Sequence, residues 1–269
     1  MEPEQNQLAS LFPEVAAQMR GALNNLHLAA AQLIPAAARE ADPALDAKAA
    51  VLDQSYYQLL RLVNSLSAAA LLTDDTPLPL SDRNIVDLVG DICDRAGDLA
   101  PLLGLNLRFV CAHEQHICAV APREMEQLLY GLLSNAFKFT PSGGTVTVEL
   151  KIVNKRILLS VIDTGCGIPE ARIDSLFDHY LHRNSLDAPP HGLGLGLSLC
   201  RCIAERQGGA LLVESRLGKG SRFTLSLPDR QVGGGVSDAP FDYAGGFNRT
   251  LLLLSDALPV KAFLVRNQD

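Results

Sequence analysis

The sequence predicts a two-domain α+β protein in which a helical hairpin precedes an α/β sandwich. In the first 75 residues, apolar side chains recur at alternating spacings of four and three, which is the heptad pattern of paired helices. Further along, the alternation in RILLSVID (156–163) predicts a half-buried strand, and LSLCRCIAERQGG (197–209) predicts a helix. This fold class follows from a purely helical start and a later mixture of strands and helices.

Residues 1–76 should form the hairpin, because Asp42 followed by Pro43 supplies an N-cap and a first-turn proline between two heptad segments. Two helices cannot bury a full apolar seam alone, whereas two hairpins make a four-helix bundle. We therefore expect a homodimer through residues 1–76, the alternative being a hairpin packed on its own second domain. The seam positions are Leu8, Phe12, Val15, Met19, Ala22, Leu26, Ala29 and Leu33 in the first helix, and Leu45, Ala49, Leu52, Tyr56, Leu59, Val63, Leu66 and Ala70 in the second.

The second domain carries glycines at two places where a ligand could approach the backbone. Asp163 ends the alternating strand, and the glycines that follow it allow a close turn around a ligand, so its carboxylate can accept a hydrogen bond from an adenine amino group. Gly192, Gly194 and Gly196 precede a helical stretch, and backbone N–H groups at a helix N-terminus can face a phosphate. Taken alone, this glycine run also fits a flexible loop. It fits neither a P-loop nor a Rossmann unit.

Three blocks together indicate a nucleotide pocket: LLSNAFKFTPSGG (132–144), DTGCGIPE (163–170) and HGLGLGLSL (191–199). With LFDHYLHR (176–183) and GKGSRFTLSLP (218–228), they resemble the ATP-binding domain that sensor histidine kinases share with DNA gyrase B, Hsp90 and MutL, and the histidine kinases most closely. SNAFKFTP is similar to the family's N box, DTGCGIP to its G1 box and GLGLGLSL to its G2 box. The resemblance implies an ATP-binding domain over residues 77–228, with a mixed sheet under three helices.

The resemblance also implies a role for individual residues. Asn135 would help to hold a Mg²⁺ ion, Lys138 would meet the phosphates of ATP, and Asp163 would recognise adenine. Gly165 and Gly167 would shape the pocket. Mg²⁺ usually takes one or two protein oxygens and leaves the rest to phosphates and water, so one Asn carbonyl suffices. In isolation, Asn135 could equally be a polar residue within helix packing, and Lys138 a solvated charge.

The polar segment HRNSLDAPPH (182–191) looks like an ATP lid, because two prolines and no apolar face leave it little to bury. We expect it to be mobile. His191 adjoins the glycine run and could touch a phosphate, although a lone loop histidine is more often merely exposed.

By position and pattern, the hairpin resembles the dimerisation and phosphotransfer domain of histidine kinases, whose first helix carries His-Glu-Leu-Arg-Thr-Pro-Leu. The family's first Leu, its Arg and its final Leu align with Met19, Arg20 and Leu23. This register puts Ala17 at the phosphoacceptor histidine and Gln18 at the acid, and a second register puts Gln18 at the histidine. Neither side chain can accept a phosphoryl group through an imidazole.

Two further positions bear on phosphoryl transfer. His27 is the one histidine on either predicted helix, and we expect no neighbouring carboxylate to take its proton, so it is a candidate acceptor only by elimination. Gly131 stands where the family commonly has an additional Asn, one helical turn before Asn135. Its loss puts phosphoryl transfer in doubt more than nucleotide binding.

Residues 229–269 form a third region, a glycine-rich linker that should be flexible and a tail without an assigned function. The apolar runs Leu251–Leu254 and Ala262–Val265 suit added strands that extend the sheet or dock on the hairpin.

Composition narrows the function. The net charge of −7 argues against a nucleic-acid partner, and no apolar run is long enough to span a membrane. Six cysteines match no zinc spacing and suit a reducing cytosol. The resemblance implies a cytoplasmic, histidine-kinase-like protein of a two-component phosphorelay that uses ATP and Mg²⁺, with a response regulator or a kinase as partner and with weak ATPase activity as one outcome. The contrasting hypothesis is a non-catalytic dimeric regulator with a vestigial pocket.

Overall fold

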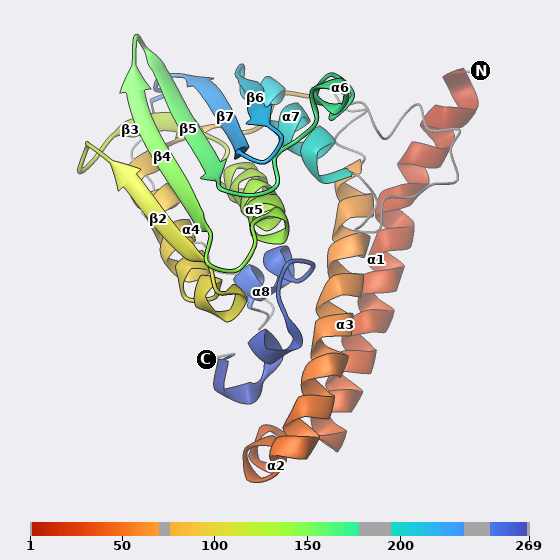
Figure 1. Ribbon diagram of the computed structural model, residues 1–269. Coiled ribbons are helices and arrows are strands. Elements are labelled where there is room, and N and C mark those ends of the chain that lie inside the picture. The colour runs from red at the N-terminus through yellow and green to blue at the C-terminus, as the bar shows by residue number, and fades with distance from the viewer. Residues whose placement is uncertain (1, 70–75, 178–194, 234–247, 268–269) are drawn as a thin grey trace. The chain divides into compact units, whose positions relative to one another are not determined.

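The computed structural model describes residues 2–69, 76–177, 195–233 and 248–267 (Figure 1). The chain forms two compact units, which are described separately. One consists of Met1–Asp74 and Gly245–Asp269, and the other of Asp75–Ala244. No helix within the described ranges has the length and hydropathy needed to cross a membrane.

The first unit is built on a hairpin of two long helices, α1 (Glu2–Leu33) and α3 (Pro43–Ala69), with the short helix α2 (Ala36–Ala41) between them. The Asp42 side chain accepts hydrogen bonds from the N–H groups of Ala44, at 2.9 Å, and Leu45, at 3.3 Å. These bonds confirm Asp42 as the cap of α3, and Pro43 is the first helical residue, where its missing N–H costs nothing. Helix α2 is an element that the sequence pattern did not predict.

Between residues 14 and 33 of α1, where side chains are described, the contact with α3 does not use the predicted seam. Ala16 is fully buried, and the Arg20 guanidinium donates to Ser67 Oγ across the hairpin at 2.8 Å. The seam residues of α1 from Val15 to Leu33, whose side chains the structure describes, instead lie on the surface of the single chain, and we call four of them the heptad stripe. Its members and their exposed fractions are Val15 at 49%, Met19 at 42%, Leu26 at 67% and Leu33 at 83%.

The C-terminal segment, residues 248–267, is helical and belongs to the hairpin unit. It consists of α8 (Arg249–Leu254) and two 3-10 turns, η3 (Val260–Phe263) and η4 (Val265–Asn267), of which α8 and η3 pack on α3. The expectation of added strands was therefore wrong, and docking on the hairpin is what the structure has. Asn248 caps α8 by accepting from Leu251 N–H at 3.0 Å, and a run of four leucines has no periodicity that separates a helix from a strand.

The second unit is an α/β sandwich whose mixed five-stranded sheet has the order β2-β4-β5-β7-β6. β2 and β4 are parallel and the other neighbours are antiparallel. The strands are β2 (Asn106–Cys111), β4 (Thr145–Val153), β5 (Arg156–Asp163), β6 (Ala210–Arg216) and β7 (Gly220–Pro228). β1 (Ser81–Asn84) and β3 (Ile117–Val120) form a separate ribbon.

Three helices cover one face of this sheet, as the resemblance implied (Figure 1). They are α4 (Ile85–Gly97), α5 (Pro122–Phe139) and α7 (Leu195–Arg206), and the short elements η2 (Ala100–Leu103) and α6 (Glu170–Ile173) complete the unit. Alternate residues of β4 and β5 point into the core beneath them, because side chains alternate between the faces of a strand. All are at most 1% exposed: Val146, Val148, Leu150, Ile157, Leu159 and Val161.

The chain after β7 remains attached to this unit. Both carboxylate oxygens of Asp82 in β1 accept backbone bonds at 2.9 Å, one from Val232 and one from Gly233. Ala119 N–H in β3 donates to Arg230 C=O at 2.7 Å. The expectation of a flexible linker was thus wrong for residues 230–233, and the rest of that linker, to residue 240, lies outside the described residues.

Candidate nucleotide site

Asp163 is the last residue of β5, and it is 7% exposed. Its Oδ1 accepts hydrogen bonds from the N–H groups of Gly165, at 2.8 Å, and Ser221, at 3.3 Å. Burial raises the pKa of this carboxyl above its ordinary value, and the two backbone bonds oppose that shift. Because both bonds end on Oδ1, Oδ2 keeps its capacity to accept a hydrogen bond from a ligand.

The loop after Asp163 is held between α5 and the β6–β7 turn. Cys166 N–H donates to the carbonyl of Phe139, the last residue of α5, at 3.2 Å, and Gly218 N–H donates to Cys166 C=O at 2.7 Å. A Cβ at Gly165 would overlap the Phe139 carbonyl oxygen. Gly167 has a φ of +67°, and a Cβ there would overlap the Arg216 carbonyl oxygen. The two predicted pocket glycines are therefore required by the packing of the loop.

Sequence reasoning gave no role to Gly220 and Ser221, which support Asp163 from the start of β7. Gly220 has a φ of +85°, and a Cβ there would overlap the Asp163 carbonyl oxygen. Ser221 supplies the second N–H to the carboxylate, and its Oγ lies 2.9 Å from Ser215 Oγ. The signal for this support was the GKGSRF block, in which Gly218 precedes β7 and Gly220 is its first residue.

Asn135 and Lys138 lie on the C-terminal half of α5, and both are partly exposed. The α5 residue Phe139 contacts the loop after Asp163, so the structure brings the end of this helix and that loop together. A partly exposed amide oxygen is a suitable ligand for a Mg²⁺ ion that takes its other ligands from phosphates and water. Lys138 lies in the last turn of α5, where the helix dipole favours a cation.

The predicted phosphate glycines are only partly described. Gly196 lies in the first turn of α7, is exposed, and leaves open space where a Cβ would be. Gly192 and Gly194, the lid segment 182–191 and His191 lie outside the described residues. The start of the segment that leads to them is fastened to α7, because Ser198 Oγ donates to Phe177 C=O at 2.9 Å and the Arg201 guanidinium lies 5.7 Å from the Phe177 ring centre.

Position 131 has little room for a side chain, because α7 packs closely against α5 there. A Cβ at this position would lie 2.9 Å from Cys200 Sγ on α7, closer than such atoms approach in proteins. Cys200 is buried, and its thiol donates to Leu128 C=O at 3.6 Å. Any side chain one turn before Asn135 would therefore require the Cys200 side chain to shift.

In the hairpin unit, Ala17 and Gln18 are exposed on α1. His27 stacks on Tyr56 of α3, with ring centres 4.2 Å apart, and its Nδ1 lies 3.9 Å from Asp53 Oδ1. The inference that His27 lacks a neighbouring carboxylate was therefore wrong, because α3 supplies one. Burial lowers the pKa of His27 below its ordinary value.

The chain is similar to known proteins over the domain that carries these residues. Residues 120–231 match the sequence profile of the family described as histidine kinase-, DNA gyrase B- and HSP90-like ATPase. The adaptive-response sensory kinase SasA of Synechococcus sp. (strain JA-2-3B'a(2-13)) is 44% identical over 110 residues, which are 40% of this chain and 29% of that protein. SasA of Rippkaea orientalis (strain PCC 8801 / RF-1) is 34% identical over 67% of this chain and 48% of its own length. The matches therefore span less than half of each relative.

Solved structures agree with the fold. Full-length ShkA in complex with AMPPNP has a TM-score of 0.65 at 24% identity, covering 87% of this chain and 47% of ShkA. The catalytic domain of the histidine kinase ThkA has a TM-score of 0.50 at 21% identity, covering 57% of this chain and 97% of that domain.

Proposed function

We propose that this chain, whose residues 120–231 form a histidine kinase-type ATP-binding domain, binds Mg-ATP in two-component signalling without phosphorylating its own first helix. Two observations carry the proposal. The carboxylate of Asp163 is held rigidly at the end of β5 with one oxygen available, and the acceptor positions on α1 hold Ala17 and Gln18. We place the protein in the cytoplasm, as a dimer that acts on a response regulator or a partner kinase.

Adenine recognition would rest on Asp163. Its Oδ2 would accept a hydrogen bond from the adenine amino group, while Gly165 N–H and Ser221 N–H hold Oδ1 in place. Such a bond is strong because the acceptor is ionised and the surroundings are largely dry. Gly165 and Gly167 would keep the loop close to the end of α5 without side chains of their own in the pocket.

Phosphates would be met by Lys138 on α5 and by backbone N–H groups at the start of α7, near Gly192, Gly194 and Gly196. When bound, Mg²⁺ would neutralise phosphate charge, and Asn135 is the residue that would hold it. Helix α5, which carries Asn135 and Lys138, is held in place by its buried face, which includes Leu128, Leu129 and Leu132.

Autophosphorylation on α1 would fail because the acceptor positions carry no nucleophile. Neither the methyl group of Ala17 nor the primary amide of Gln18 can replace an imidazole. His27 is a poor substitute, because its ring is stacked on Tyr56 and only 28% of its side chain is exposed. The neighbouring Asp53 is bound by Arg39 at 2.7 Å, which weakens it as a proton acceptor for His27.

Dimerisation would bury the heptad stripe. The single hairpin leaves Val15, Met19, Leu26 and Leu33 at 42–83% exposure, although their spacing is that of a bundle interior. Leu52 and Leu59, which share the seam pattern in α3, are 47% and 48% exposed. A second hairpin would cover these faces and complete a four-helix bundle.

The second candidate function is a regulator that binds its partner without transferring a phosphoryl group. Gly131 favours this function, because it packs against Cys200 and supplies no polar side chain beside the proposed metal ligand Asn135. Incubation with γ-labelled ATP, followed by mass spectrometry of any modified residue, separates the two. Label on a response regulator or a partner kinase would favour phosphoryl transfer, and nucleotide binding without label on this chain or its partner would favour the regulator.

A further inference from the structure

The C-terminal segment returns the chain to the unit in which it began. Residues 75–244 form the ATP-binding unit, yet residues 245–269 pack with residues 1–74. The ATP-binding unit is thus an insertion in the hairpin unit, with one covalent connection at each end. A simple tandem of two domains would have a single connection.

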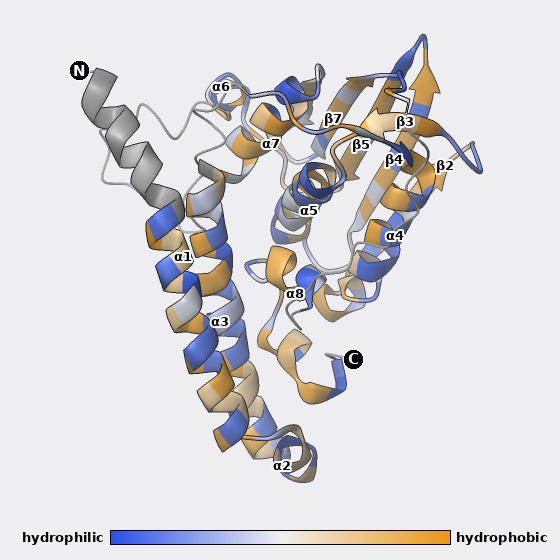
Figure 2. Cartoon of the chain, turned by 180° about the vertical axis from the view of Figure 1, so that it is seen from behind, coloured by the Kyte–Doolittle hydropathy of each residue, from blue (hydrophilic) through white to orange (hydrophobic). Residues whose placement is uncertain are grey.

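An apolar surface on α3 receives the segment. Tyr57 contacts Phe263 with ring centres 5.5 Å apart, and α8 is mostly apolar (Figure 2). The segment buries six apolar side chains to 3% exposure or less, namely Leu251, Leu252, Leu254, Leu258, Ala262 and Phe263. Segments that bury this much apolar surface are held firmly.

Polar groups on the same side of α3 complete the contact. Gln54 Nε2 donates to Leu258 C=O at 2.9 Å, and Gln58 Nε2 donates to Ser255 C=O at 3.3 Å. Arg61 forms an ion pair with Asp256. The spacing of Gln54, Gln58 and Arg61 by four and three residues puts all three on one face of the helix, so all three reach the segment from the same side.

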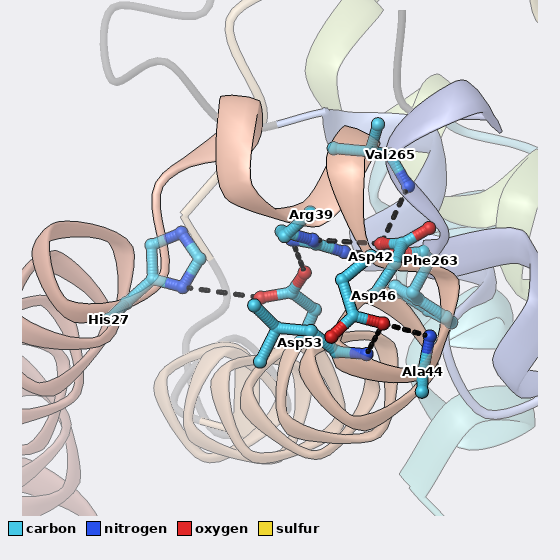
Figure 3. Close-up of polar contacts among 9 residues, drawn as sticks. His27, Arg39, Asp42, Ala44, Asp46, Asp53, Phe263 and Val265 are labelled. Carbon is cyan, nitrogen blue, oxygen red and sulfur yellow. Dashed lines mark hydrogen bonds and ion pairs between the residues drawn. The ribbon is translucent and has the colours of Figure 1, made fainter.

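A buried cation joins three parts of the unit (Figure 3). Arg39 of α2 is 9% exposed, and its guanidinium donates to Asp46 Oδ1 at 2.9 Å and Asp53 Oδ2 at 2.7 Å on α3. It also donates to Phe263 C=O at 2.9 Å. Asp46 Oδ1 accepts Val265 N–H at 3.3 Å. A buried guanidinium that loses one partner is strongly destabilised, so the tail carbonyl and the two carboxylates support each other.

We propose that residues 245–269 are a clamp that fastens the far end of the ATP-binding unit to the hairpin, with Arg39 as the latch that holds η3 against α2 and α3. With the clamp in place, both ends of the ATP-binding unit are tied to the hairpin unit. This double attachment limits how far the ATP-binding unit can move from the hairpin unit. Release of the clamp would leave the ATP-binding unit on a single connection and expose the apolar face of α3.

The test is to replace residues 236–240 of the full chain by a protease site, cleave the folded protein, and measure by size exclusion and mass spectrometry whether the C-terminal fragment stays bound. We expect the native sequence to retain the fragment after cleavage. Arg39→Met and Phe263→Ala should each lose it, and Phe263→Ala leaves every hairpin side chain unchanged. Arg266→Met is the matched control, because Arg266 lies exposed in the same segment.

Each outcome of this experiment either supports or contradicts the clamp. Retention by the native and Arg266→Met proteins, together with loss from Arg39→Met or Phe263→Ala, supports the clamp. Departure of the fragment from the cleaved native protein overturns it. Retention by Arg39→Met removes Arg39 as the latch, because Phe263→Ala leaves in place the main-chain carbonyl that Arg39 binds. Because the readout is fragment retention, a failure of nucleotide binding or of dimer formation would not affect it.

Discussion

The Sγ atom of Cys200 lies 2.9 Å from the point that a Cβ on Gly131 would occupy. This relationship connects α7, which follows the glycine run, with α5, which carries Asn135. A side chain at position 131 therefore has to displace the Cys200 side chain from its present position.

Gly131→Asn alone should overpack this contact and lower the free energy of unfolding by about 1–3 kcal/mol. Adding Cys200→Ala should recover part of that loss, because the alanine removes the sulfur that the new side chain meets. Urea titrations of the two single variants and the double variant measure the coupling. Additive effects would show that the two positions do not interact.

Leu26→Glu should turn the proposed dimer into a monomer, since it puts a charge in the middle of the heptad stripe. Leu28→Glu is the matched control. Leu28 is 59% exposed on the same helix, two positions away and therefore outside the stripe. Light scattering at micromolar concentration reads the oligomeric state. If Leu28→Glu dissociates the dimer and Leu26→Glu does not, the interface uses another face of α1.

Acidification should destabilise the hairpin unit through His27, whose pKa is lowered by burial from the ordinary 6.5. The unfolded chain then binds a proton that the folded chain resists, so the free energy of unfolding falls as pH drops below about 6.5 and down to the lower folded pKa. His27→Gln should flatten this slope. Urea midpoints between about pH 5 and 7 compare the two proteins, and an equal slope in both would assign the effect to another group.

No acid-labile label should appear on α1 after incubation with labelled ATP, because the acceptor positions hold Ala17 and Gln18. The double variant Ala17→His, Gln18→Glu tests whether an acceptor is all that is missing. Label in this variant would show that the ATP-binding unit is catalytically competent. Label in the native chain that disappears in His27→Gln would identify His27 as the acceptor and contradict the proposal.

Much of the fold follows from local pattern. Alternation in RILLSVID located β5, and Asp42 with Pro43 located the start of α3, because period and caps are read within a few residues. The α8 leucines were misjudged as a strand because four apolar residues in a row fit either element. These leucines form a helix because they pack against α3. That contact is distant in the sequence, so no local pattern predicts it.

The candidate site, like the fold, could be predicted only where a local sequence pattern records it. The strand end and its glycines located Asp163 and its loop. The support from Ser221, the carboxylate that Asp53 brings to His27, and the Gly131–Cys200 contact join residues 26 to 69 positions apart. Contacts of this kind are set by how elements pack, and a sequence pattern shows only one element at a time.

The most direct test of the central claim is calorimetric titration of the native chain and Asp163→Asn with ATP or ADP in the presence of Mg²⁺. Asparagine keeps the volume of the side chain and removes the anionic acceptor, so binding should weaken by about 1.5–3 kcal/mol. Asp98→Asn, at an exposed position in the same unit, is the matched control and should bind like the native chain. Measurable binding by the native chain with the predicted loss in Asp163→Asn is the expected result, and no binding by the native chain would contradict the account.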